Sequence, residues 1–304
     1  MMYLKRIFLA LLPLLLLTGC GDDDPSATDG PDSEQQEATQ NTNRNQTNVV
    51  PQAWRLEFPR LKGGDNLVIV HSTANYGVNY SLEWNPSKNA QRWSCYQMYA
   101  ANSVANTSRY YSKDNQYPQD PQLPREYQLP GDPFWNSGYD HGHICPSADR
   151  LCSYEANVQT FYLTNMQPQR NVFNAGLWSK MEGQVRTWNR GNFRDTLYVC
   201  KGGTIDKEEH IIKYLGSGLS KIPVPRYFFM ALLCKNSDGY KALGFWAEHS
   251  DYDHSTDRLA DYVVNIDQLE ELTGIDFFCN LPDAIENRIE SLPLDNVKRA
   301  WGMN

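Results

Sequence analysis

One short segment, residues 137–150, constrains the fold and the chemistry of this 304-residue chain more than any other part of it. Residues 140–143 place two histidines, an aspartate and a glycine within four positions. Gly138 and Pro146 flank them and disfavour a helix, so the segment is expected to form a short strand. A neutral imidazole is a natural general base near neutral pH, and the segment therefore predicts a catalytic histidine carried on a strand.

A second segment, which follows about thirty residues later, has the periodicity of a helix. Its apolar residues recur at spacings of four, four and three and form one stripe: Leu177, Met181, Val185 and Trp188. A neighbouring strip, stepping by four, consists of Asn174, Trp178, Glu182 and Arg186. An amide, a carboxylate and a guanidinium on one strip, beside a strand with histidines, could hold a cation and a phosphate group.

With these two segments in this order, the chain resembles the DNA/RNA non-specific endonucleases, whose core is the ββα-metal, or His-Me, finger. The family's Asp-Arg-Gly-His motif, followed by Pro and an Ala-Asp pair, stands here as residues 140–143, Pro146 and 148–149. The downstream pattern is met by Tyr162 to Asn165, Pro168-Gln169, Asn174, Gly176, Trp178 and Glu182. The likeness covers about residues 65–283.

The resemblance implies a sugar-non-specific endonuclease that hydrolyses phosphodiester bonds in single- or double-stranded DNA and RNA. It implies His143 as the general base and Asn174 as the direct protein ligand of one Mg²⁺, which Mn²⁺ could replace. It further implies that Glu182 holds a water bound to the metal, that Arg186 contacts the phosphate, and that Asn165 orients His143 or such a water.

The chain departs from the family motif at His141, where the family has an arginine. His141 could take that arginine's place at the substrate phosphate, or it could turn away from His143 and pack within the finger. Arg109 could match a further arginine of the family, although the spacing of the intervening loop differs. Glu182 and Arg186 could also form no more than a surface ion pair at i,i+4.

Two other classes of function stay open at this point. The chain could be a nucleic-acid-binding surface lipoprotein with little or no activity, an alternative that His141 alone suggests. It could also be a metal-dependent phosphodiesterase that acts on small substrates. Digestion of nucleic acid with and without EDTA separates these alternatives from an endonuclease.

The N-terminus predicts export. A basic start is followed by an apolar run from Ile7 to Leu17, which is too short for a membrane-spanning helix and is typical of a signal peptide. The run ends with residues 17–20, Leu-Thr-Gly-Cys, and resembles the lipobox of bacterial lipoproteins. We therefore expect residues 1–19 to be removed and Cys20 to be lipidated, so that the protein is anchored to a membrane of the bacterial cell envelope, where it could be exposed at the surface.

Removal of residues 1–19, with Lys5 and Arg6, changes the formal net charge from −8 to −10, of which residues 20–50 carry −6 and residues 51–304 carry −4. Residues 20–50 hold seven acidic residues and one arginine and have no apolar period, so we expect a disordered acidic tether there. The endonuclease domain is then expected to span 51–304. Six Lys and Arg residues against two Glu between Arg150 and Arg194 leave room for a local basic groove that attracts phosphates.

The remaining six cysteines are an even number, which in an exported protein suggests disulfides, although the sequence does not choose among the pairings. Buried free thiols are the alternative for Cys200 and Cys234, which stand in apolar segments. Strands are expected over 66–73, 77–84, 93–98, 197–204, 227–234 and 241–248, helices over 266–273 and 283–291, and a long surface loop over 101–136. Strands and helices that mix without βαβ alternation predict an α+β fold with a mixed or antiparallel sheet.

Overall fold

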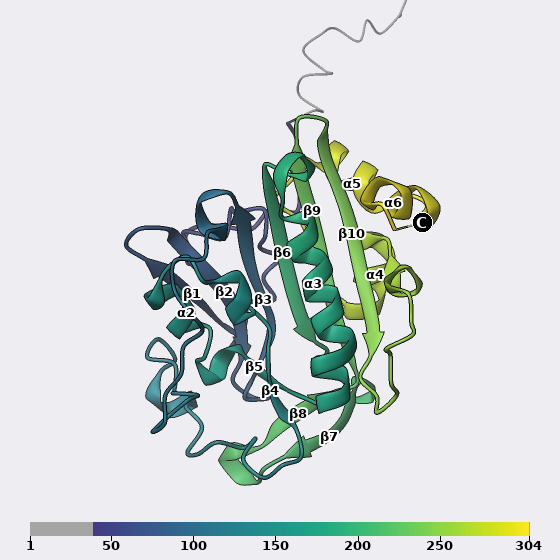
Figure 1. Ribbon diagram of the computed structural model, residues 1–304. Helices are drawn as coiled ribbons and strands as arrows, with labels where there is room; N and C mark the ends of the chain where they lie inside the picture. The colour runs from purple at the N-terminus through teal and green to yellow at the C-terminus, as the bar shows by residue number, and fades with distance from the viewer. Residues whose placement is uncertain (1–38, 304) are drawn as a thin grey trace, which may run out of the picture.

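The computed structural model describes residues 39–303 and has an α+β fold, as expected. Its centre is a seven-stranded antiparallel sheet in the order β1-β2-β3-β6-β9-β10-β11 (Figure 1). The strands are β1 (Leu67–Thr73), β2 (Gly77–Asn85), β3 (Ala90–Tyr99), β6 (Thr196–Gly203), β9 (Tyr227–Asn236), β10 (Gly239–Glu248) and β11 (Val263–Val264). The predicted strands agree with these bounds to within a few residues.

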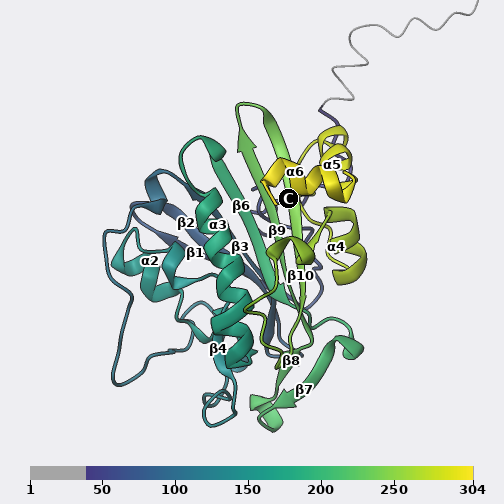
Figure 2. The same ribbon diagram turned by 45° about the vertical axis from the view of Figure 1, so that its right-hand side comes forward.

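Both faces of this sheet are covered, which follows from the nearly continuous apolar run of β9. Phe228, Met230 and Leu232 join one core cluster together with residues of α3 (Ser179–Trp188). Phe229, Ala231 and Leu233 alternate with them and join a second cluster on the other face, with residues of α4 (Ile266–Thr273) and α5 (Asp283–Glu290). Figure 1 shows α3 crossing the front of the sheet, and Figure 2 shows α4, α5 and α6 (Leu294–Trp301) beside β10.

Two small sheets lie outside the large one. One pairs β4 (Asp140–His143) with β5 (Met166–Gln169), and the other pairs β7 (Ile211–Leu215) with β8 (Ile222–Pro225). A short helix, α2 (Tyr154–Gln159), separates β4 from β5 along the chain. The segment 101–136 holds only two single-turn 3₁₀ helices, as a loop should, but it is anchored by Asp120, a buried residue that accepts hydrogen bonds from His71 and Thr164.

The expected disordered tether is wrong for part of its length, because residues 41–45 contact the domain through their side chains. Asn41 donates a hydrogen bond to the Cys279 carbonyl at 2.9 Å. Asn45 is buried, and its amide nitrogen donates to the Pro59 carbonyl at 2.9 Å. Asparagine side chains attach this segment by donating hydrogen bonds to backbone carbonyls. Such contacts need no apolar residues, so the sequence shows no apolar periodicity there. The signal peptide, Cys20 and the tether up to residue 38 lie outside the described residues.

The expectation of disulfides is also wrong for the part of the chain that the structure describes. Its six cysteines are free and buried: Cys95, Cys145, Cys152, Cys200, Cys234 and Cys279. Even Cys95 and Cys200, which face each other in the register of β3 and β6, are unbonded. These residues fill the core as small apolar side chains, the alternative noted for Cys200 and Cys234.

Across residues 39–303, every helix is too short or too polar to span a membrane.

Candidate active site

The site is built on the antiparallel pair of β4 and β5, over which the chain returns as a helix, and this is the ββα arrangement expected from the sequence. His141 lies opposite Pro168 and His143 opposite Met166. Between them, Gly142 is required by a close approach, since a Cβ at this position would come within 2.4 Å of the Gln169 side chain.

Asn165 fixes the turn that follows β4. Its amide oxygen accepts a hydrogen bond from the Cys145 backbone N–H at 2.9 Å, and its amide nitrogen donates to the carbonyls of Cys145 and Thr160, each at 2.8 Å. The residue is fully buried. The Asn165 side chain thus holds the backbone of the finger and makes no hydrogen bond to the His143 ring.

The His143 ring has one nitrogen engaged and one without a partner. Its Nδ1 lies 3.3 Å from the His141 carbonyl, to which it can donate, and its Nε2 has no hydrogen-bond partner among residues 39–303. The edge-to-face contact with Phe161 fixes the ring further, with centroids 4.8 Å apart. Burial, assisted by the nearby Arg109 guanidinium, lowers the pKa of His143 to about 3. The ring is therefore neutral near pH 7, with the lone pair on Nε2.

His141 packs within the finger but does not turn away from His143. Residues two apart on a strand share a face, and both rings contact Tyr117. The His141 ring stacks between Tyr117 at 3.7 Å and Phe134 at 4.4 Å, and its Nε2 lies 2.9 Å from an Asp132 carboxylate oxygen. Burial acts to raise the pKa of the Asp132 carboxyl group, but the hydrogen bond from His141 opposes burial and the pKa is lowered.

Asn174 lies in η5 (Phe173–Trp178), a π-helical turn that leads into α3. Its amide nitrogen donates to an Asp140 carboxylate oxygen at 3.0 Å. Because an ionised carboxylate only accepts hydrogen bonds, this contact requires the nitrogen to face Asp140 and leaves the amide oxygen available for a cation. Asp140 thus connects β4 to the start of the helix and orients the Asn174 side chain.

Glu182 lies two turns further along the helix and is held by a buried cation. Its carboxylate is 2.8 Å from the Lys201 ammonium group of β6, which itself lies 4.7 Å from the centre of the Trp178 ring. Burial raises the pKa of Glu182, although the Lys201 charge opposes the shift. The alternative noted from the sequence was a surface ion pair between Glu182 and Arg186. These two side chains are 3.9 Å apart, and the closer cation to Glu182 is the buried Lys201.

An open hollow of about 420 Å³ brings most of the predicted site residues together. Its lining includes His141, His143, Asn174 and Glu182. Arg109, which the sequence suggested only by order along the chain, lies there too, with its guanidinium 4.7 Å from the centre of the Phe161 ring. Among the residues in 39–303, Arg109 has no acidic group within ion-pair distance.

Arg186 lies in an adjacent, smaller hollow of about 220 Å³, which shares Ala148 with the first. Its guanidinium forms an ion pair with the buried Asp149 carboxylate at 3.1 Å and is 31% exposed. The side chain thus lies next to the catalytic hollow but not within it.

Asn174 and Glu182 give this hollow an oxygen-donor set, an amide and a carboxylate, that suits a hard divalent cation such as Mg²⁺. Sulfur ligands are absent from its lining. The unpartnered Nε2 of His143 is a proton acceptor beside these oxygen atoms. The donor set therefore fits the single-metal site that the sequence predicted.

Comparisons with known proteins agree with this geometry. The sequence pattern of the DNA/RNA non-specific endonucleases matches residues 66–284. A nuclease of Nostoc sp. is 32% identical over 222 residues, which are 70% of this chain and 75% of that protein. The mitochondrial nuclease EXOG of Xenopus laevis is 28% identical over 214 residues, which are 67% of this chain and 58% of that protein.

Among solved structures, a chain of the EndoG/EndoGI complex superposes with a TM-score of 0.59 at 21% identity, covering 72% of this chain and 89% of that one. This likeness shows that the two chains share a fold.

Proposed function

The chain belongs to the DNA/RNA non-specific endonuclease family, a family of metal-dependent hydrolytic nucleases, and from this premise we propose that it cleaves DNA and RNA with His143 as general base and one Mg²⁺ at Asn174. The observation that carries the proposal is the unpartnered Nε2 of His143, in a hollow that also contains Asn174, Glu182 and Arg109.

His143 accepts the proton of the attacking water. Donation from Nδ1 to the His141 carbonyl fixes the tautomer in which Nε2 carries the lone pair. The lowered pKa keeps that lone pair free at neutral pH. The lowered pKa also makes His143 a weaker base than an exposed histidine. Proton transfer therefore depends more on the position of the His143 ring relative to the attacking water than on the basicity of the ring.

Asn174 would hold the metal through its amide oxygen, since Asp140 fixes the amide nitrogen. When bound, Mg²⁺ supplies Lewis acidity and stabilises negative charge on the leaving oxygen. Glu182 would accept hydrogen bonds from water in the hollow, and the Lys201 ammonium group, 2.8 Å away, opposes the rise in pKa that burial imposes on this carboxylate. Mn²⁺ also prefers oxygen ligands and is expected to replace Mg²⁺.

Arg109 is the side chain best placed to contact the substrate phosphate, because it lines the hollow and no carboxylate among residues 39–303 forms an ion pair with it. Arg186 is a second candidate from the adjacent hollow, where a planar guanidinium can bind phosphate while it keeps one contact to Asp149. Contacts to phosphates carry no sequence information, which supports action on DNA and RNA with little base preference. Both faces of the His141 ring are stacked on aromatic rings, so His141 could contact the phosphate only with the edge of its ring.

The test is digestion of supercoiled plasmid and of RNA with Mg²⁺ and with EDTA. Loss of general-base catalysis typically costs about 10²- to 10⁴-fold, so His143→Ala should lose that much activity. Asn174→Ala should need more Mg²⁺ and reach a lower maximal rate. His210→Ala, a histidine outside the site, is the matched control. Near-normal cleavage by folded His143→Ala protein would refute the assignment, and binding without cleavage by the parent protein would favour an inactive binder.

The N-terminal residues support a location for this activity. The apolar run from Ile7 to Leu17 and the following Cys20 favour an exported lipoprotein anchored through Cys20. We propose that the nuclease domain is held by this anchor at a membrane of a bacterial cell envelope.

A further inference from the structure

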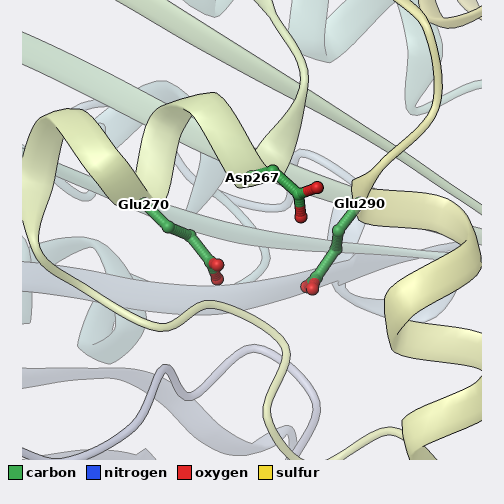
Figure 3. Close-up of side chains that lie close together, drawn as sticks. All are labelled: Asp267, Glu270 and Glu290. Atoms are coloured by element: carbon green, nitrogen blue, oxygen red, sulfur yellow. The ribbon is translucent and has the colours of Figure 1, made fainter.

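A second group of oxygen ligands lies away from the candidate active site, between α4 and α5. Asp267 and Glu270 come from α4 and Glu290 from the end of α5, and one carboxylate oxygen of each lies within 4.8 Å of the other two. Figure 3 shows the three side chains extending toward a common centre. Asp267 and Glu270 are three positions apart and so share one face of their helix.

Glu290 is the member that most needs a partner. The residue is only 5% exposed, and its Oε1 atom is buried with no hydrogen-bond partner among residues 39–303. Glu270 is better satisfied, since one of its oxygens accepts a hydrogen bond from the Phe277 backbone N–H at 2.7 Å. A buried carboxylate without a partner is costly, and proteins satisfy such groups with a proton, a cation or a hydrogen-bond donor.

The surroundings add negative charge. Asp276 and Glu286 lie beside the group, bridged by the Asn43 amide nitrogen at 3.3 Å and 2.9 Å. Arg60 is the cation that faces this region, but its guanidinium donates to the backbone carbonyls of Asn43 and Arg44.

We propose that Asp267, Glu270 and Glu290 form a calcium-binding site that joins α4 to α5. The ligands are all oxygen atoms, without the sulfur or imidazole that zinc or copper prefers. Calcium binds several carboxylates at about 2.3–2.6 Å, so oxygens on opposite sides of the ion are about 5 Å apart, which agrees with the separation here. Magnesium is seldom held by a set of protein carboxylates alone, because it keeps much of its water.

Such an ion would also stabilise the place where the N-terminal segment joins the domain. Asn43 belongs to that segment and contacts Glu286, one turn before Glu290 on α5, while Thr42 contacts Asp283 at the start of the same helix. Calcium at this position would therefore strengthen the attachment of residues 41–45 to the C-terminal helices. This role does not depend on catalysis or on the metal at Asn174.

The experiment uses Asn174→Ala protein, so that an ion at the catalytic site is not counted. Calcium is titrated by calorimetry and by thermal unfolding. We expect one calcium per chain and a Tm that rises with calcium concentration. Glu290→Gln should weaken calcium binding by about tenfold or more, because ligand charge sets affinity. The same substitution should remove most of the rise in Tm on addition of calcium, because the ion loses one of its three carboxylates.

Glu270→Gln is the second variant, because glutamine keeps an acceptor for the Phe277 N–H, and it should also weaken calcium binding. Glu126→Gln, an exposed glutamate in the 101–136 loop, should change neither property. The proposal is overturned if the Asn174→Ala protein shows no calcium binding up to about 10 mM, above the ~0.1–1 mM range of extracellular calcium modules. It is equally overturned if Glu290→Gln and Glu270→Gln bind calcium as tightly as the Glu126→Gln control.

Discussion

Replacement of Lys201 by methionine is a sharp test of how the candidate active site is held together. The Lys201 ammonium group is 2.8 Å from Glu182, and the two side chains are only 1% and 13% exposed. Methionine keeps an unbranched apolar side chain of similar length and removes the charge that lies 4.7 Å from the centre of the Trp178 ring. Glu182 is then left as a buried carboxylate whose remaining cation is Arg186, 3.9 Å away and already paired with Asp149.

Removal of one partner from a buried ion pair typically costs about 3–5 kcal/mol. Because Arg186 offers partial compensation and methionine preserves the packing, we expect the lower end, about 3 kcal/mol. For a domain of this size each kcal/mol lowers Tm by about 2–4 °C, so Lys201→Met should unfold about 6–12 °C below the parent protein. Differential scanning calorimetry in EDTA measures this shift without interference from bound metal.

The pH dependence separates charge from packing. Burial raises the pKa of Glu182 in the folded protein above its unfolded value, and loss of Lys201 should raise it further. Between the two pKa values the folded state binds more protons than the unfolded state, so this group lowers stability as pH rises. The destabilisation by Lys201→Met, measured against the parent, should therefore be larger at pH 8 than at pH 5.

Lys113→Met, at an exposed lysine, is the control and should change Tm little at either pH. If the Lys201→Met deficit were the same at pH 5 and pH 8, the loss would come from packing and the ion-pair argument would fail.

Four further predictions concern single side chains. His141→Ala should lose about 1–3 kcal/mol of stability, because it removes two stacking contacts. Arginine can also stack, so His141→Arg should have a Tm near that of the parent protein and an activity within a few-fold of it. Equal Tm values for the parent and both variants would contradict this. Asn165→Ala should cost about 2–4 kcal/mol in urea unfolding because it leaves buried backbone groups of Cys145 and Thr160 unpaired, and an unchanged midpoint would rule this out. Arg109→Met, in His143→Ala protein with EDTA, should reduce the slope of log affinity for DNA against log salt by about 1, and no change in slope would remove Arg109 from the phosphate. Cys20→Ser should shift the protein out of the membrane fraction or block its processing, and fractionation identical to the parent would exclude the lipid anchor.

The large sheet was predictable from sequence because its strands carry long apolar runs that end at turn residues. The register and order of the strands were not, since pairing such as β3 with β6 joins segments almost a hundred residues apart. The hairpin of β7 and β8 and the helix α6 were missed. Residues 41–45 were predicted to belong to a disordered tether, because they are polar like the residues before them and their contacts with the domain are hydrogen bonds.

The helix of the site was predicted with the correct apolar stripe, but the polar strip needs a different explanation. In η5 the Ser179 N–H donates to the Asn174 carbonyl five residues back, so the helix is wider there than an α-helix. Steps of four do not keep residues on one line across such a turn. Trp178 is consequently buried while Asn174 and Glu182 line the hollow, and Arg186 reaches the adjacent one. No periodicity in the sequence signals this local widening.

The charges of the hollow favour a bound cation. Lys201 and Arg186 are each neutralised by a carboxylate, so among residues 39–303 Arg109 is the cation at the hollow that has no ion-pair partner. Asp140 lies in the same hollow and would repel a substrate phosphate. The cation proposed at the amide oxygen of Asn174 would lie near the Asp140 carboxylate, which holds that side chain, and would offset this repulsion. On that proposal, binding of the ion would supply part of the positive charge that an acidic chain needs in order to bind a polyanion.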